Sequence, residues 1–304
     1  MRRKMTLPVI LLLLQALSAF PQKMGIKAPA WVIYEQGNAL YAGKEYGSAL
    51  KKYQEALASF YPFPEVEMAI GDVYRQEGEL DLAIIRYKKA YELRNSFYIP
   101  EMKYEALYRL ANVYEDTRAY RDMEDALKTI VAEDKNFSPS ETSRLREQFT
   151  ANYYSKGIDF VLKLYRFPER FSADAHAKLG WFYYRTGNYT TAVTHLLYAL
   201  TYKVSDAGAY AYEKDVEFQF TTLSAFLGLA SKDSVIGGYF QKSEIYKDLY
   251  YLAGSVFKSG YPAHARDIWQ VLSKYPPAGS YAELSSRQLK APWTEPLLSI
   301  PVKN

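Results

Sequence analysis

Few residues in this 304-residue sequence have the types and spacing that catalysis or metal binding requires. The three histidines, His176, His195 and His264, are scattered along the chain. None belongs to a His-x-x-x-His pair or a Glu-flanked pair of the kind that binds zinc. Each falls at a helical position, where the ordinary expectation is an exposed histidine or one at the rim of the core. The sequence therefore predicts no metal site.

Two short segments match the pattern of a serine nucleophile beside a lysine. They are Ser48–Lys51 and Ser255–Lys258, but both lie inside expected helices and neither has a Lys-Thr-Gly partner. The Gly43-Lys44 pair lacks the upstream glycines of a phosphate-binding loop. Carboxylates are abundant, and on helices they usually form a solvated face. We therefore predict no catalytic residue, no cofactor and no enzymatic activity.

Composition excludes several classes of protein. The chain has no cysteine, which rules out a disulfide-stapled mini-fold and a Cys-rich zinc module. With 38 Lys and Arg against 34 Asp and Glu, the net charge of +4 is too small to indicate a nucleic-acid partner. The apolar share of 49% is that of an ordinary packed protein, whereas the 30 tyrosines are an excess that composition alone does not explain.

The first twenty residues have the layout of a secretory signal peptide. A basic head, Arg2-Arg3-Lys4, precedes an apolar run over 7–20. As a helix this run would be about 21 Å long, shorter than the hydrocarbon core of about 30 Å. We expect a signal peptide over 1–19, whose removal takes away three cations and no acid and lowers the net charge from +4 to +1. An uncleaved signal segment that anchors the chain in a membrane is the alternative.

The sequence repeats with a period of 34 residues. A set of small and aromatic residues recurs at this displacement: Gly37, Ala49, Tyr53 and Ala56 return as Gly71, Ala83, Tyr87 and Ala90. The same internal spacing reappears further along the chain as Gly180, Ala192, Leu196 and Ala199, and as Ala253, Ala265, Trp269 and Leu272. A small residue midway along each of two paired helices lets them pack closely, and large apolar residues three and four positions on fill the neighbouring space. The spacing therefore predicts an all-helical chain of hairpins.

The clearest copy is Leu179–Tyr183, with the pattern Leu-Gly-x-x-Tyr, followed by Ala192–Ala199, whose two alanines fit the second-helix pattern Ala-x-x-x-Tyr-x-x-Ala. With the 34-residue period, this pattern resembles the tetratricopeptide repeat family. The resemblance implies an all-α, right-handed superhelical solenoid of antiparallel helix hairpins, with about six to seven units. The expected units cover 30–63, 64–97, 104–137, 173–206 and 246–279, with a degenerate unit over 138–172.

The predicted organisation has six parts. They are the signal peptide (1–19), a linker (20–29), the repeat array (30–206), a divergent helical segment (207–245), a C-terminal repeat unit with a capping helix (246–290) and a Pro-rich extended tail (291–304). The divergent segment either continues the stack or splits it into two lobes. The tail is expected to pack on the last helix, and a free docking peptide is the alternative.

In this family the first helix of each repeat lines a concave binding face. The resemblance carries that role to Tyr34, Asn38, Tyr41, Arg75, Tyr108, Asn112, Trp181, Tyr184, Arg185, Tyr250 and Phe257. Asn38 and Asn112 stand where an amide can bind a peptide backbone, and Tyr, Trp and Arg are favoured interface anchors. Packing between hairpins is the competing role for each aromatic residue. The family's carboxylate clamp is doubtful, because Tyr34 and Glu105 occupy two of its basic positions and only Arg109 and Lys178 remain.

These observations together predict an exported, non-enzymatic scaffold or assembly factor. Its partner would be another protein, an envelope or membrane-complex component, and nucleic acid is not expected. Signal-bearing arrays of this kind look bacterial, so the predicted address is the periplasm, or the inner membrane if the signal segment is not cleaved. The alternative function is a small-molecule or lipid-binding accessory protein of a membrane transporter, since an aromatic groove can also enclose an apolar ligand.

Overall fold

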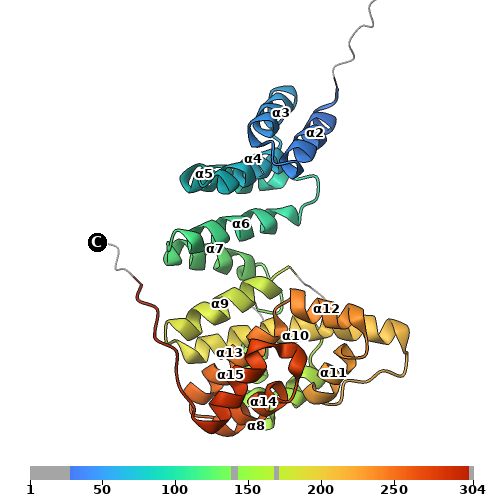
Figure 1. Cartoon of the computed structure of the whole chain (residues 1–304), viewed down its shortest axis with the longest axis vertical. Helices are drawn as coiled ribbons and strands as arrows, with labels where there is room; N and C mark the ends of the chain where they lie inside the picture. The colour runs from blue at the N-terminus through green and yellow to red at the C-terminus, as the bar shows by residue number, and fades with distance from the viewer. Residues whose placement is uncertain (1–27, 138–142, 168–170, 301–304) are drawn as a thin grey trace, which may run out of the picture.

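The computed structural model describes residues 28–137, 143–167 and 171–300, and within these ranges it contains helices and no strand (Figure 1). Most of the helices form antiparallel hairpins: α2 (Ala30–Ala42) with α3 (Tyr46–Ser59), α4 (Pro64–Glu77) with α5 (Leu80–Glu92), α6 (Met102–Asp116) with α7 (Tyr120–Ala132), α9 (Ala173–Arg185) with α10 (Tyr189–Lys214), and α13 (Ile245–Lys258) with α14 (Pro262–Ser273). The all-α solenoid predicted from the repeat is confirmed. The expected signal peptide lies outside the described residues.

The small residues of the repeat set how closely the paired helices approach. A Cβ atom added at Gly71 in α4 would lie 2.6 Å from a ring carbon of Tyr87 in α5, and one at Gly37 would lie 2.4 Å from the ring of Tyr53. These tyrosines are fully buried. Each hydroxyl then reaches back to the residue that follows the glycine in the first helix. Close packing and one internal hydrogen bond therefore define each of the first two hairpins.

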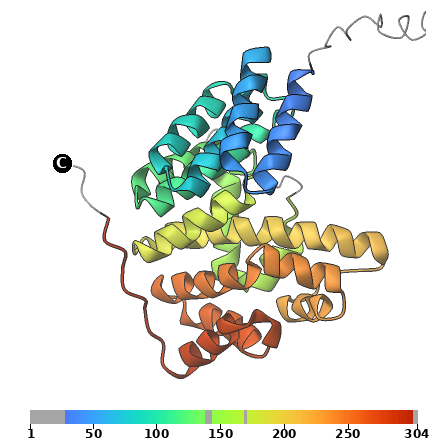
Figure 2. The ribbon, with the colours of Figure 1, turned by 45° about the horizontal axis from the view of Figure 1, so that its top comes forward.

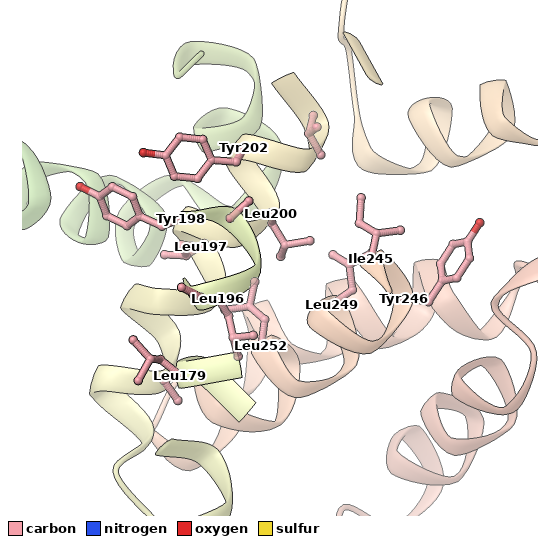
Figure 3. Close-up of a cluster of buried hydrophobic side chains, with 14 of the residues drawn as sticks. Leu179, Leu196, Leu197, Tyr198, Leu200, Tyr202, Ile245, Tyr246, Leu249 and Leu252 are labelled. Atoms are coloured by element: carbon pink, nitrogen blue, oxygen red, sulfur yellow. The ribbon is translucent and has the colours of Figure 1, made fainter. Parts of the chain in front are cut away.

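Successive hairpins stack in chain order. The second helix of one hairpin packs against the first helix of the next, as α3 does on α4, α5 on α6, α7 on α9 and α10 on α13. Figure 3 shows the last of these contacts, where Leu196 and Leu200 of α10 lie near Leu249 and Leu252 of α13, all four of them buried. The buried apolar side chains form two clusters: a small one between the first two hairpins, from Ile33 to Val73, and a main column between the later layers, from Met68 to Ala278.

The degenerate unit expected over 138–172 is not a layer of this stack. Its described part forms α8 (Ser143–Leu164), which is interrupted at Gly157, where φ is +81°. This helix packs against α10, α14 and the short α11, whereas α9 packs directly on α7. The repeat period places residues along the chain but does not say which segment enters the column, so this prediction is corrected.

The divergent segment does not split the molecule into two lobes. Helix α10 runs on to Lys214, past the expected boundary at 206, and the short helices α11 (Leu223–Ala230) and α12 (Ser234–Lys242) follow it. These two helices pack on each other, α12 also contacts α13, and α13 still contacts both α9 and α10. The segment therefore lies beside the column of stacked hairpins, which continues past it from α10 to α13 (Figure 2). Helix α15 (Ser280–Lys290) then covers α14.

Short 3-10 turns, η2 (Arg94–Ser96) and η3 (Pro276–Ala278), complete the described secondary structure. In the described ranges no helix combines the length and the apolar character that crossing a membrane would need.

Two glycines of the fourth hairpin provide a test of the close-packing constraint. A Cβ atom at Gly180 would lie 2.5 Å from Leu196 Cγ, whereas one at Gly208 in α10 meets nothing within 4 Å. We expect Gly180→Ala to lower the free energy of unfolding by about 1–3 kcal/mol through overpacking. Gly208→Ala should raise it by about 0.5–1 kcal/mol, because alanine loses less backbone entropy in a helix. Urea unfolding followed by far-ultraviolet circular dichroism measures both, and equal shifts would contradict the packing argument.

Candidate binding groove

The predicted groove residues fall into two groups in the structure. Tyr34, Asn38, Tyr41, Arg75, Tyr108 and Asn112 lie on α2, α4 and α6, and Trp181, Tyr184, Arg185, Tyr250 and Phe257 lie on α9 and α13. Within the described residues no ring contact joins a tyrosine of the first group to one of the second. The two groups therefore need separate descriptions.

In the first hairpin the polar groups are largely engaged within the fold. Asn38 accepts a hydrogen bond from the Tyr53 hydroxyl at 2.9 Å and donates to Glu35 at 3.3 Å. The Tyr34 ring packs on Tyr53 and on the ring of Phe63, with centroids 6.0 and 5.5 Å apart. Burial raises the pKa of the Tyr34 phenol above its ordinary value, so it stays neutral. Asn38 therefore serves first as a structural acceptor, which sequence reasoning missed.

Ion pairs connect successive first helices across this end of the groove. Arg75 of α4 contacts Asp116 of α6 at 2.7 Å, and Arg109 of α6 contacts Asp72 of α4. Asp72 also accepts from the Tyr87 hydroxyl at 2.7 Å. Burial raises the pKa of the Asp72 carboxyl, and the guanidinium of Arg109 opposes that rise. These pairs fix the spacing of α4 and α6.

The two cations left for a carboxylate clamp are both occupied. Arg109 contacts Glu105 at 3.1 Å as well as its partner on α4, and Lys178 of α9 contacts Glu115 of α6 at 3.1 Å. A chain-terminal carboxylate would have to displace these internal partners. The arrangement therefore gives no support to a clamp.

Tyr108 of α6 connects two layers through hydrogen bonds. Its hydroxyl donates to the carbonyl of Phe171 at 2.7 Å and accepts from the Ala175 N–H at 2.9 Å, in the first turn of α9. Burial raises the pKa of this phenol, which remains a neutral donor. Tyr108 is predicted to line the groove, and its side chain is partly exposed, but both hydrogen bonds of its hydroxyl hold α6 to the start of α9.

Trp181 is part of a buried charged network. Its indole N–H donates to Asp248 Oδ1 at 3.0 Å, and Lys203 Nζ donates to Asp248 Oδ2 at 2.6 Å. Asp248 is 0% exposed and the Lys203 side chain 3% exposed. Burial raises the pKa of Asp248 to about 6, and the lysine opposes a further rise. The ammonium of Lys247 lies 3.4 Å from the centroid of the Trp181 ring.

The other aromatic residues on α9 and α13 serve packing more than the surface. Tyr184 is buried against the rings of Tyr189 and Tyr251, with centroids 5.8 and 5.0 Å apart. Tyr250 is buried, and its hydroxyl accepts from Gln288 Nε2 at 3.1 Å. The predicted roles of Tyr184 and Tyr250 as exposed groove residues are therefore corrected.

Phe257 and Arg185 differ from these two tyrosines. Phe257 packs against Trp269 with centroids 5.6 Å apart. Arg185 is exposed, and its carbonyl accepts a hydrogen bond from Leu298 in the C-terminal tail at 2.7 Å. This contact brings the tail to the predicted groove. The sequence predicts that the tail packs on the last helix, and Gln288 of α15 does bond to the backbone of Trp293 at the start of the tail.

Two of the histidines meet in the interior, although they are 19 residues apart. His176 of α9 and His195 of α10 are buried with their Nδ1 atoms 2.9 Å apart, and Asp134 Oδ2 lies 3.4 Å from His176 Nε2. Burial lowers the pKa of both imidazoles below the ordinary value, so both are neutral near pH 7. The expectation of isolated rim histidines is wrong for this pair. In the described part of the chain no group of three His, Cys, Asp or Glu side chains could hold a metal ion.

Comparison with known proteins identifies the repeat. Residues 34–96 match the tetratricopeptide repeat family. A protein of Treponema pallidum (strain Nichols) is 24% identical over 252 residues, which is 82% of this chain and 67% of that protein. A protein of Borreliella burgdorferi (strain ATCC 35210 / DSM 4680 / CIP 102532 / B31) is 25% identical over 293 residues, which covers 86% of this chain and 90% of the relative. Both relatives are uncharacterized.

Similar solved structures include the TPR2AB-domain:pHSP90 complex of yeast Sti1, with 14% identity and a TM-score of 0.32 over 86% of this chain and 95% of that chain. Yeast Tom70 is another, with 16% identity and a TM-score of 0.31 over 86% of this chain and 55% of that one.

The two aspartates near Lys203 provide a test of the buried network. Asp248 is fully buried 2.6 Å from the ammonium, whereas Asp174 lies 3.8 Å away with its side chain 71% exposed. Asp248→Asn leaves a buried ammonium without its counter-charge, so we expect a loss of about 3–5 kcal/mol in the free energy of unfolding. Asp174→Asn should cost less than about 1 kcal/mol. Urea midpoints distinguish the two variants, and similar losses would mean that the burial of Lys203 is not what makes Asp248 important.

Proposed function

We propose, from the premise that this chain is a tetratricopeptide repeat protein, that it is a scaffold or assembly factor for another protein of the cell envelope. Proteins of this fold generally act as interaction scaffolds without an enzymatic activity. The envelope partner and the periplasmic address are the specific parts of the proposal. The alternative address is the inner membrane, with an uncleaved signal segment as the anchor.

One observation carries the proposal. Helices α2, α4 and α6 lie in successive layers and leave partly exposed polar and aromatic side chains on the same side of the array. Tyr41 and Asn112 are half-exposed, and the Tyr41 hydroxyl faces Gln76 and Asp72 of α4. Amide groups can donate to and accept from a peptide backbone, and tyrosine supplies contact area at little entropic cost. This partly exposed surface on α2, α4 and α6 suits a protein segment better than a compact small ligand, which would need an enclosed pocket.

The proposed address is supported by the sequence of the first twenty residues. The basic head and the fourteen-residue apolar run are typical of an export signal, and the remaining chain is nearly neutral. A nearly neutral chain has little attraction for nucleic acid or for an anionic membrane surface.

Photocrosslinking in intact cells tests this function. A photoreactive residue at position 41 or 112 should crosslink the same periplasmic protein, whereas one at the exposed Gln54 on α3 should not. With that protein purified, Tyr41→Ala plus Asn112→Ala should weaken its binding about tenfold or more, or about 1.4 kcal/mol. Gln54→Ala is the matched control. The proposal fails if positions 41 and 112 capture nothing, or if the double variant binds as tightly as the unaltered chain.

A second candidate function has its own observation. A cavity of about 710 Å³ lies between α8, α10 and the segment leading to α11. Its lining is mainly apolar and aromatic, with two exposed cations: Lys163, Arg166, Phe167, Val204, Ser205, Gly208, Ala209, Tyr212, Phe218, Gln219, Phe220 and Phe226. An apolar cavity with cations at its edge suits an amphiphile with an anionic head. This observation favours the lipid-binding alternative, at a place other than the aromatic groove.

A fluorescent fatty acid tests the second candidate. Gly208→Phe should fill the cavity, because nothing lies within 4 Å of an added Cβ atom at that position, and should weaken binding about tenfold or more. Gly47→Phe, at an exposed helical glycine with the same open surroundings, is the matched control. Equal binding by both variants, or no binding by the unaltered chain, would remove this candidate.

A further inference from the structure

The C-terminal tail, residues 291–300, occupies the part of the groove formed by α13 and α9. In Figures 1 and 2 it leaves α15 and runs back along one side of the molecule toward the earlier layers. It contains no helix. Its contacts involve Trp293, Glu295 and the two leucines, and Ile300 at the end of the described tail also packs against the main core.

The first contact fixes the start of the tail. Gln288 of α15 is buried, and its side-chain amide pairs with both backbone groups of Trp293: Trp293 N donates to Oε1 at 3.0 Å, and Nε2 donates to Trp293 O at 3.1 Å. The same Nε2 donates to the Tyr250 hydroxyl of α13. One amide side chain therefore forms a hydrogen bond with both the N–H and the carbonyl of an extended residue, as the backbone of a neighbouring strand would.

The second contact is electrostatic. The Tyr251 hydroxyl donates to Glu295 Oε2 at 3.5 Å. Burial raises the pKa of the Glu295 carboxyl, and this hydroxyl and the positive charge of Arg185 oppose that rise. The cation belongs to α9 and the hydroxyl to α13, the two helices below the tail. An acidic residue at this place of an extended peptide is thus matched by the surface below it.

The third contact is made mainly by the second of two adjacent leucines, Leu298. Leu298 N donates to the Arg185 carbonyl at 2.7 Å, and the Leu297 methyl groups lie 3.5 Å from where a Cβ atom of Gly187 would be. Leu298 also lines a small cavity between α6, α7 and α9, together with Glu115, Tyr120, Met123, Lys178, Trp181, Phe182 and Arg185. A leucine side chain therefore enters the junction between two repeat layers.

These contacts are those of a bound peptide rather than of a packed element. They use the tail's backbone, one acidic side chain, and the partly buried Leu298 and Ile300, which pack against the edge of the main core, while Leu297 remains 59% exposed. Pro292 and Pro296 restrict the backbone to extended conformations, which lowers the entropy lost on binding. An occupant attached at so few points can be exchanged for another of the same chemistry.

We propose that this surface, hereafter the tail site, is a binding site for an extended segment of a partner protein that has the pattern of Glu295–Leu298: an acidic residue, a proline and two leucines. The chain's own tail is its intramolecular occupant, and the partner's segment displaces it. This inference rests on the proposed scaffold function and states which chemistry the scaffold recognises at this end.

A labelled synthetic peptide of residues 291–304 tests the tail site in the full-length chain. In the unaltered protein the attached tail competes at an effective concentration on the order of millimolar, so the peptide should bind weakly. Leu298→Asp in the protein should release the tail and raise the peptide's affinity about tenfold or more. Val216→Asp, at an apolar residue that is 73% exposed elsewhere on the molecule, is the matched control and should change nothing.

The specificity of binding is tested on both sides. A peptide that itself carries Leu298→Asp should not bind the Leu298→Asp protein, and Arg185→Glu in that protein should weaken the unaltered peptide by repelling Glu295. Leu298→Ser, which introduces no charge, is the second releasing variant if the first one melts early by circular dichroism.

Three results would overturn the inference. The first is no peptide binding by either releasing variant, and the second is equal binding by the unaltered and Leu298→Asp proteins. The third is a dimer of the unaltered protein that Leu298→Asp abolishes, which would assign the site to the tail of a second copy. This assay needs only the purified chain and a peptide. Failure to find a cellular partner therefore contradicts the scaffold function but does not affect the peptide result. Failure of the peptide to bind contradicts the tail site but does not affect the photocrosslinking result.

Discussion

The close approach of two helices at a residue without a large side chain is the constraint on which the rest of this structure depends. At Gly37 and Gly71 the ring of a buried tyrosine takes the place that a Cβ atom would fill, and at Gly180 a leucine does so. The tyrosine hydroxyl, held over the first helix, then bonds to Asn38 or to Asp72. The contact between the tyrosine and the glycine therefore sets the distance between the paired helices and also engages a polar side chain on the groove face. A residue on the groove face cannot be changed without regard to the tyrosine beneath it.

The tyrosine excess has the same physical basis. Several tyrosines lie between layers with their rings in the core and their hydroxyls on a carboxylate, as Tyr183 does on Glu124 at 2.6 Å and Tyr104 on Glu133 at 2.8 Å. Burial raises the pKa of Tyr104 to about 12, so this phenol is a neutral donor to a charged acceptor. A tyrosine in this position fills apolar space and also satisfies a carboxylate at the edge of the column. The abundance of tyrosine therefore reflects packing between repeats more than a continuous binding surface.

The sequence was sufficient for those features that depend on local period. The 34-residue displacement of Gly37 to Gly71 places five hairpins near their observed bounds, because one small residue per helix determines the pairing. It could not show that α8 leaves the column, because periodicity describes a helix face and not its neighbour. Nor could it pair His176 with His195 or Lys203 with Asp248. The available signal was Lys203 alone, which is the one charge in the largely apolar run over 196–204. The contact of Leu298 with Arg185 was also hidden, since an extended tail has no period.

The two ends of the groove differ in what a partner must displace. Over α2, α4 and α6 the side chains are bonded within a repeat or between neighbouring repeats, and a partner meets a surface that is already formed. Over α9 and α13 it meets the chain's own tail, which is present at an effective concentration on the order of millimolar. On the proposed function, a segment that only resembles the tail competes poorly unless its concentration is comparable. A partner that also contacts the N-terminal helices gains the same intramolecular advantage that the tail has. The tail therefore favours partners that engage both ends of the array, so the scaffold would select for extended segments attached to a second binding region.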